Sequence, residues 1–319
     1  MKISVLVPTF RRPDDLERCL AALGAQTRRA DEVVVVARRE DAPTVAALER
    51  WIAVKAVHGL RVAWVDEPGQ VAANNCGLRA AHGELILITD DDAAPYRDWV
   101  ERIEAHFARD PQLGGVGGRD LVHERGALLT GDARKVGLLS WYGRVTGNHH
   151  IGSGAPRDVQ ILKGANMAWR RDAIEGLRFD TRLLGAGAQV HNDLAFSLAV
   201  HKRGWKLLYD PMVRVDHFPA ERADDDKRFV LNASAYFNAA YNYRFVMREH
   251  LSGPGRIAFV AFCSLVGTRA DPGLARAALL ALQGQGWTQS FYKVWISARA
   301  TWAVFGEADR GRGPAAHHA

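Results

Sequence analysis

The chain has 319 residues, of which 48% are hydrophobic and 24% are charged, and these are the proportions of a globular protein. They exclude disorder over most of the length, and the length fits one large or two modest domains. The net charge of +6 would suit an anionic partner, but no compact run of lysine and arginine occurs, so we expect no nucleic-acid binding.

The start of the chain lacks the pattern of an export signal. Its first apolar run, Ile3 to Val7, is too short for the core of a signal peptide. No window reaches the roughly 18 apolar residues that a membrane-spanning helix requires. The three cysteines are far apart and predict neither a disulfide framework nor a zinc site, so a reducing cytosol is the expected setting.

The first hundred residues alternate between strand and helix patterns. Short continuous apolar runs predict buried strands at 3–7, 33–36, 62–65 and 85–88. Apolar residues three and four positions apart predict helices at 13–24, 44–57, 71–82 and around 99–107. Repeated strand–helix–strand units imply an α/β fold with a mainly parallel sheet, in which ligands bind beyond the carboxyl ends of the strands.

The middle of the chain is less regular. Residues 126–160 have weak periodicity and are expected to form a long functional or mobile loop. A strand is expected at 166–169, a helix at 193–202, and two strands at 205–209 and 213–215. The glycines at 114–118 resemble a dinucleotide fingerprint only loosely, because Asp120 stands where the last glycine belongs.

After about residue 222 the patterns are helical, so we expect one domain over 1–222 and a helical region over 223–319, with a disordered tail from about residue 311. This region mixes basic residues with tryptophans and apolar residues. Such a region can lie at a membrane surface, or its helices can pack on the first domain or on another subunit. The sequence leaves both alternatives open.

Three consecutive aspartates, Asp90, Asp91 and Asp92, directly follow the predicted strand 85–88. Adjacent carboxylates at the end of a buried strand repel one another, so they favour a site for Mg²⁺ or Mn²⁺ with a phosphorylated substrate. The triple aspartate at 224–226 serves as an internal comparison, because it has charged neighbours and no preceding strand. It is expected to be a solvated helix start.

Several ordered blocks over about residues 1–220 resemble the inverting, nucleotide-sugar-dependent glycosyltransferases of family 2, which have the GT-A fold. Together they are far more specific than any one of them. The blocks are Pro8-Thr9-Phe10, Asn75-Cys76-Gly77, Ala81-His82-Gly83-Glu84, Asp90-Asp91-Asp92, the segment from Lys163 to Arg171, Phe179-Asp180, Asn192-Asp193, Tyr209-Asp210-Pro211 and His217.

The resemblance implies transfer of a sugar from a nucleotide-sugar donor to a glycan or lipid-linked acceptor, with Mn²⁺ or Mg²⁺ as cofactor. It implies a place in cell-envelope or exopolysaccharide assembly, in the cytoplasm or peripherally at the inner face of the cytoplasmic membrane. Asp193 would be the general base for the acceptor hydroxyl. The resemblance assigns donor binding to Pro8, Thr9, Asn75, Asp90 and Asp91, and metal binding to Asp90, Asp92 and His217.

The chain departs from the family pattern at the base pocket. Ala37-Arg38-Arg39 follows the second strand, where the family often has an acidic residue, and Asn74 replaces a frequent arginine. The nucleotide is therefore not assigned. Two other classes of protein remain as alternatives. These are a nucleotidyltransferase, which lacks support because no Gly-rich phosphate loop follows the first strand, and a non-catalytic binding protein with the same fold.

Five further residues have their own interpretations. His149 and His150 lie in a glycine-containing loop and are expected to be exposed to solvent. His191 precedes the expected base and could contact a substrate or lie on the surface. Trp169 is expected in the core, and Cys76 is expected to serve packing.

Overall fold

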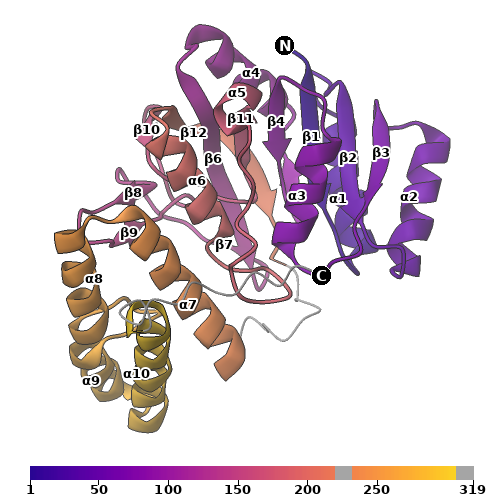
Figure 1. Ribbon diagram of the computed structural model, residues 1–319. Coiled ribbons are helices and arrows are strands. Elements are labelled where there is room, and N and C mark those ends of the chain that lie inside the picture. Colours follow the sequence, from indigo (N-terminus) through magenta and orange to yellow (C-terminus); the bar gives the residue numbers. More distant parts are fainter. Residues whose placement is uncertain (220–231, 307–319) are drawn as a thin grey trace.

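The computed structural model describes residues 1–219 and 232–306 (Figure 1). Four strands at the N-terminal end form an all-parallel part of its main sheet. They are β1 (Ile3–Pro8), β2 (Glu32–Ala37), β3 (Leu60–Trp64) and β4 (Leu85–Ile88), in the spatial order β4-β1-β2-β3. Every residue of β1, β2 and β4 is buried, which explains why these strands have continuous apolar sequences. The predicted strands and the α/β class are confirmed.

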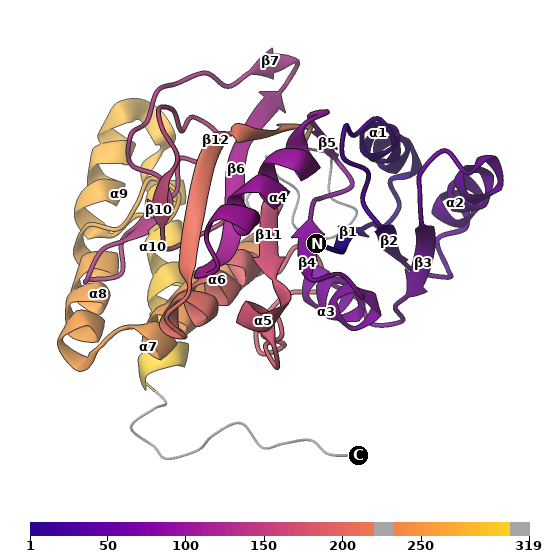
Figure 2. The same cartoon turned by 90° about the horizontal axis from the view of Figure 1, so that it is seen from above.

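The connecting helices are α1 (Pro13–Gly24), α2 (Ala42–Val54) and α3 (Gln70–Ala80). Helix α2 ends three residues before its predicted end because Lys55 adopts a left-handed conformation, with φ of 50°. After β4 come the short strand β5 (Ala93–Pro95) and helix α4 (Trp99–Arg109). Helices α1, α2 and α4 cover one face of the sheet, and α3 lies on the other (Figure 2).

Longer strands extend the sheet beyond β4. Strand β6 (Leu113–Glu124) pairs in parallel with β12 (Lys206–His217), and β11 (Met167–Arg170) is antiparallel to both β4 and β6. The sheet is thus mixed, in the order β10-β12-β6-β11-β4-β1-β2-β3. Helices α5 (Arg171–Ile174) and α6 (Asn192–Lys202) pack on the face that carries α3 (Figure 2).

Two predictions for the middle of the chain were wrong in detail. The strands expected at 205–209 and 213–215 are one strand, β12, whose register shifts between Asp210 and Arg214. The loop expected at 126–160 contains short paired strands: one pairs with the end of β6, two pair with each other, and one pairs with β12. They are β7 (Ala127–Leu128), β8 (Leu138–Leu139), β9 (Val145–Thr146) and β10 (Arg157–Val159).

The glycines at 114–118 lie within β6, where they allow close packing rather than nucleotide binding. A Cβ atom built on Gly118 would lie 1.7 Å from the carbonyl oxygen of Val213 on β12. A side chain at this position would therefore push the two strands apart, which accounts for the glycine without a dinucleotide fingerprint.

The C-terminal part that the structure describes consists of α7 (Ala233–His250), α8 (Gly253–Leu265), α9 (Leu274–Leu280) and α10 (Trp287–Thr301), with π-helical segments at Ala281–Gln285 and Trp302–Gly306 (Figure 1). The buried residues of α7, among them Tyr243 and Met247, belong to the same hydrophobic core as the α6 face of the sheet. The expected domain boundary at residue 222, the aspartates at 224–226 and the tail from about 311 lie outside the described residues.

A buried arginine joins these helices. The side chain of Arg244 on α7 is fully buried, and its Nη1 lies 2.8 Å from Oδ2 of Asp271. Nη1 also donates to the carbonyl of Ala240, Nε donates to the hydroxyl of Thr301, and Nη2 donates to the hydroxyl of Ser297. Each nitrogen of the guanidinium therefore has a partner, which is the condition under which a buried charge is tolerated.

Candidate active site

A cleft of about 190 Å³ opens at the carboxyl ends of the parallel strands. This is the edge at which ligands of α/β proteins bind. Its walls combine residues from the ends of β1 to β4, from α3 and from a loop before α6. They are Pro8, Thr9, Phe10, Arg12, Arg38, Val65, Glu67, Gly69, Gln70, Ala73, Asp90, Asp91, Asp92, Ala186, Gly187 and Ala188.

The three aspartates after β4 form the acidic floor of this cleft. Asp91 and Asp92 are 3% and 2% exposed, respectively, and Asp90 is half-buried. Oδ1 of Asp90 accepts a hydrogen bond of 3.1 Å from Gln70. Nη1 of Arg12 lies 3.1 Å from Oδ1 of Asp91 and 3.5 Å from Oδ2 of Asp92. One guanidinium thus faces two buried carboxylates.

Because these carboxylates are buried and close to one another, it is unfavourable for all of them to be ionised at the same time. Burial and the charge of Asp92 raise the pKa of Asp90 to about 6. Burial raises the pKa of Asp91 to about 7, although Arg12 opposes the shift. A cluster of this kind is stabilised when a cation neutralises it.

His217 completes a group that could hold such a cation. It lies at the end of β12, where its Nε2 is 3.2 Å from Oδ1 of Asp92. Ligand atoms of Asp90, Asp92 and His217 all lie within 4.8 Å of one another. Burial would lower the pKa of His217, but its hydrogen bond to Asp92 and the charge of that carboxylate outweigh burial and raise it. Two carboxylates and one imidazole are ligands that fit Mn²⁺, and the carboxylates also fit Mg²⁺.

Asp193 lies in the first turn of α6 and is not part of the cleft lining. Its Oδ2 accepts a hydrogen bond of 3.1 Å from the backbone of Gly164, and its Oδ1 accepts one of 2.8 Å from the backbone of Leu194. His191, two residues before Asp193, is in a left-handed conformation with φ of 76°. These contacts fix the orientation of the carboxylate while each oxygen keeps a further lone pair.

Lys163 interacts electrostatically with Asp120 and with both acidic sites, namely the aspartates of the cleft and Asp193. Nζ of Lys163 lies 3.3 Å from Oδ2 of Asp120, whose side chain is fully buried on β6. Burial would lower the pKa of Lys163, but the negative charges of Asp120, Asp193 and Asp90 outweigh it and raise the pKa. The ammonium group is therefore within electrostatic reach of both the cleft and Asp193.

The loop 184–190 forms one wall of the cleft and is held from both sides. Its Gly187 carbonyl accepts from the backbone of Gln70 at 2.8 Å, and Oε1 of Gln189 accepts from the backbone of Val71 at 3.0 Å. Asn242 on α7 is fully buried and bonds the backbone of Leu184 at 2.7 and 3.0 Å and that of Val190 at 3.1 Å. A second cavity of about 90 Å³ lies between this loop and α7.

The far end of the cleft carries the atypical segment after β2. The Arg38 guanidinium lies 4.6 Å from the centre of the Phe10 ring, and that of Arg11 lies 4.9 Å from it. Glu67 lines the same pocket. Cationic and aromatic groups therefore stand where the family often has a carboxylate, so the departure noted in the sequence falls within the cleft.

The remaining candidate residues lie elsewhere. Both ends of the Asn75 amide bond the backbone of Phe179, at 2.9 and 2.8 Å, and Asn75 is not part of the cleft lining. Trp169 is fully buried, as predicted. The exposure expected for His149 is wrong. It is 5% exposed, its ring packs against that of Tyr209 with centroids 5.8 Å apart, and its Nε2 bonds the carbonyl of Ile161 at 2.9 Å.

Sequence reasoning did not assign Arg12, Gln70, Lys163 or Asp120 to the site. Lys163 was within a matched block, so its position could have drawn attention. Arg12 and Gln70 sit at or just before the first turns of α1 and α3, whose N-termini point at the cleft edge. A polar residue at the start of a helix that follows a parallel strand indicates a binding-site residue, but only indirectly.

Sequence comparison finds relatives of this chain among proteins of glycan assembly. The chain is 32% identical over 237 residues to the O-antigen biosynthesis protein RfbC of Myxococcus xanthus, covering 70% of this chain and 18% of that protein. It is 20% identical to a dolichyl N-acetyl-α-D-glucosaminyl phosphate glucuronosyltransferase of Methanococcus voltae, covering 73% of this chain and 71% of that protein. Three of the curated relatives are matched over only 18%, 33% and 48% of their length.

Among solved structures, the mannosyltransferase PcManGT from Pyrobaculum calidifontis, in complex with GDP-Man and Mn²⁺, shares the fold with a TM-score of 0.57. The match has 21% identity and covers 96% of this chain and 88% of that one. The family model described as glycosyl transferase family 2 matches residues 4–173, which is more than half of the chain. The chain therefore belongs to glycosyl transferase family 2.

Proposed function

We propose that this protein transfers a sugar from a nucleoside-diphosphate donor to an acceptor hydroxyl, with inversion at the anomeric carbon and with a divalent cation as cofactor. The observation that carries the proposal is the acidic floor of the cleft, where Asp90, Asp92 and His217 place ligand atoms within 4.8 Å of one another. The fold supports it, because the cleft lies where α/β proteins bind nucleotides.

Asp90, Asp92 and His217 would hold the cation, and the imidazole favours Mn²⁺ over Mg²⁺. When bound, the cation would stabilise negative charge on the leaving diphosphate. Gln70 would keep Asp90 oriented through its 3.1 Å hydrogen bond. Arg12 would hold Asp91 and Asp92 in place and neutralise part of their charge. Pro8 and Thr9, which line the cleft, would contact the nucleotide.

Asp193 would act as the general base. The acceptor oxygen forms a bond to the anomeric carbon, the bond from that carbon to the diphosphate breaks, and the proton of the acceptor hydroxyl passes to Asp193. The backbone hydrogen bonds from Gly164 and Leu194 keep the carboxylate in one orientation for this transfer. Lys163 would contact the ligand between the two acidic sites, held there by Asp120.

The acceptor would be a glycan or a lipid-linked saccharide of cell-envelope or exopolysaccharide assembly, reached from the cytoplasm at the inner face of the cytoplasmic membrane. The relatives support this class of acceptor, because one is described as an O-antigen biosynthesis protein and another by a dolichyl-phosphate-linked sugar.

Calorimetry with UDP, GDP, dTDP and CMP, with and without Mn²⁺, tests the donor site. We expect one nucleotide to bind in a metal-dependent manner, and we expect Asp92→Asn to weaken this binding at least about tenfold by removing a ligand. Asp158→Asn, an exposed carboxylate on β10, is the matched control and should bind as the wild type does.

Two results would overturn the proposal. Binding of none of the nucleotides would favour a non-catalytic protein of this fold. Release of pyrophosphate from a nucleoside triphosphate and a sugar phosphate would favour a nucleotidyltransferase, because glycosyl transfer releases a nucleoside diphosphate instead.

A further inference from the structure

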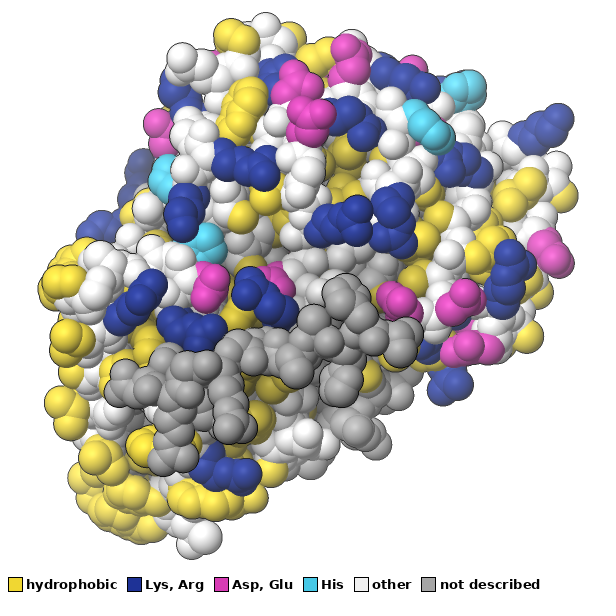
Figure 3. Space-filling model, viewed as in Figure 1, with side chains coloured by type: hydrophobic (Ala, Val, Ile, Leu, Met, Phe, Trp, Pro, Cys, Tyr) yellow, Lys and Arg dark blue, Asp and Glu magenta, His cyan; other side chains and the backbone are white. Residues whose placement is uncertain are grey.

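Helices α8 to α10 expose an unusual number of large hydrophobic side chains. Eleven of the seventeen exposed ones in the described ranges lie between residues 257 and 302. Figure 3 shows hydrophobic side chains gathered over this end of the molecule. A contiguous apolar surface of this kind marks a contact with a partner or a membrane. The eleven are Ile257, Leu265, Val266, Leu274, Leu279, Leu282, Trp287, Phe291, Tyr292, Trp295 and Trp302.

The aromatic residues follow one side of α10. Trp287, Phe291 and Trp295 are four residues apart, so they line up along the helix, and they are 54%, 38% and 53% exposed. The rings of Trp287 and Phe291 stack with centroids 5.8 Å apart. The opposite side of α10 is buried through Ile296 and Ala300. This row of aromatic side chains therefore faces solvent, while the other side of α10 packs in the interior of the protein.

The charge of the same region is one-sided. Between residues 251 and 306 the sequence has five basic residues and one acidic residue, Asp271. Asp271 does not offset the surface charge, because Arg244 and Tyr236 bind its two oxygens. The basic residues are Arg256, Arg269, Arg276, Lys293 and Arg299. Apolar and cationic groups together match the interface of an anionic bilayer, where aromatic rings sit at headgroup level.

Other occupants fit this face less well. A second copy of the chain, related by two-fold symmetry, would bring two surfaces with the same excess of positive charge together, which is repulsive. Insertion across the bilayer does not fit either, because none of the helices in the described ranges is long and apolar enough to cross a membrane. The remaining arrangement is one in which α8 to α10 lie in the plane of the interface.

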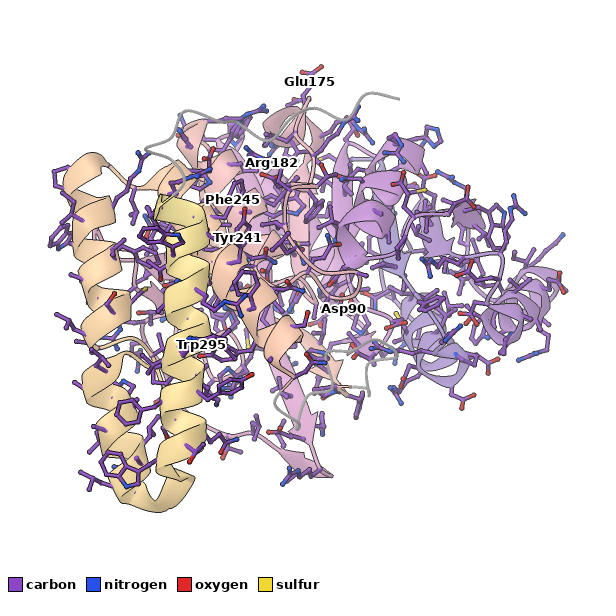
Figure 4. All side chains as sticks on the ribbon, turned by 60° about the horizontal axis from the view of Figure 1, so that its bottom comes forward. Asp90, Glu175, Arg182, Tyr241, Phe245 and Trp295 are labelled. Atoms are coloured by element: carbon purple, nitrogen blue, oxygen red, sulfur yellow. The ribbon has the colours of Figure 1, made fainter. Side chains whose placement is uncertain are left out.

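We propose that the outer face of α8–α10 docks on an anionic lipid bilayer, with Trp287, Phe291 and Trp295 inserted among the headgroups and the basic residues on the lipid phosphates. In Figure 4, Trp295 comes from α10, whereas Asp90 comes from the end of β4, so the docking face is separate from the cleft. Helix α7 links the two, since its Arg244 bonds α10 and its Asn242 bonds the cleft loop 184–190. Docking would thus set the orientation of the cleft relative to the bilayer.

The test is sedimentation of the full chain with vesicles of phosphatidylcholine alone and of phosphatidylcholine mixed with phosphatidylglycerol. We expect binding to the mixed vesicles, weakened by salt, and at most weak binding to the neutral ones. The triple variant Trp287→Ser, Phe291→Ser, Trp295→Ser should bind about tenfold less tightly or worse. The double variant Arg256→Gln, Arg269→Gln should lose most of the preference for anionic vesicles.

The matched control is the double variant Ile52→Ser, Val54→Ser on α2, at the edge of the sheet far from α8–α10 (Figure 1). It removes exposed apolar side chains outside the proposed docking face and should not change vesicle binding. Circular dichroism and thermal denaturation show whether each variant is folded. The proposal is overturned if the wild type ignores anionic vesicles, or if the triple variant binds them as the wild type does. It is also overturned if the wild type is a stable dimer that the triple variant dissociates. Failure of nucleotide binding would count against the proposed function alone.

Discussion

The cleft and the helical region both bury ionic side chains, but they balance them differently. In the cleft, Arg12 and His217 face three aspartates at the end of one strand. In the helical region, Arg244 faces one carboxylate, Asp271, and its remaining hydrogen bonds go to two hydroxyl oxygens and one carbonyl oxygen. The first cluster keeps an excess of negative charge, whereas the second is satisfied within the protein.

The two regions show that buried charged side chains can serve either structure or ligand binding. A satisfied pair contributes to one defined structure, and removing one partner is strongly destabilising. An excess of like charge is unfavourable in the protein alone, so it points to a ligand that compensates for it. We therefore expect changes in the cleft to affect binding and turnover, and changes around Arg244 to affect folding.

The largest effect is expected at Asp193. Asp193→Asn should lower turnover by roughly a hundredfold to ten-thousandfold, because general base catalysis contributes about this much. Donor binding measured by calorimetry should stay unchanged, since Asp193 is not part of the cleft lining. Near-normal turnover would show that another group takes the proton. Asp158→Asn serves as the control.

The next effect should fall on stability. Arg244→Met leaves Asp271 without its buried partner and should reduce the free energy of unfolding by about 3–5 kcal/mol. Urea denaturation measures this change, and the exposed Arg256→Met is the control, expected within about 0.5 kcal/mol of wild type. Nucleotide affinity of the folded variant should remain unchanged. A stable variant with lost affinity would contradict the division between the two regions.

Lys163 and Asp120 sharpen the comparison, because they form an ion pair whose lysine also interacts electrostatically with Asp90 of the cleft and with Asp193. Lys163→Met should lower kcat/KM about tenfold through loss of a charged contact to the ligand, and it should also destabilise the fold by leaving Asp120 buried alone. The double variant with Asp120→Asn should recover stability but not activity. Recovery of both would mean that the pair is structural only.

The smallest effect concerns pH. The raised pKa of Asp91, about 7 against 3.8 when unfolded, means that the folded protein binds more protons between these values. Without divalent cation, this carboxylate should lower stability as pH rises from about 4 to 7. Asp91→Asn should flatten that slope in thermal denaturation followed across this range.

Glu32 on β2 should have the opposite effect. Burial would raise its pKa, but hydrogen bonds from Ser4, His82 and Arg61 lower it to about 2, from 4.5. The stability that it contributes is therefore complete above pH 4.5 and is lost as pH falls through about 2. A Glu32→Gln variant whose acid denaturation follows that of wild type would rule out this contribution.

The sequence predicted the elements whose signals are local. Strands β1 to β4 and helices α1 to α4 have continuous or periodic apolar patterns, and their order alone implied the parallel sheet. Two separate strands were expected at 205–209 and 213–215, whereas β12 continues through a shift in register that its pairing with β6 stabilises. His149 was expected in solvent, but a carbonyl twelve residues away buries it. Such contacts leave no local pattern.

The residues of the candidate site likewise include some that local sequence patterns predicted and others that they did not. The three aspartates were visible because they follow a buried strand. Their grouping with His217, and the role of Asp193, came from the resemblance to a family rather than from spacing. Arg12 and Gln70 could not be placed, because their importance depends on the distance between helix starts and the end of β4 in three dimensions.

The hydrogen bonds of Asn242 limit which parts of this protein can be exchanged with those of a relative. By bonding the backbone at both ends of the loop 184–190, it makes a helix outside the matched segment 4–173 responsible for one wall of the cleft. A chimera that joins this sheet to the helices of a relative would keep all three aspartates and still lose the shape of the pocket. Exchange of parts between family members should therefore succeed only when the loop and α7 are transferred together.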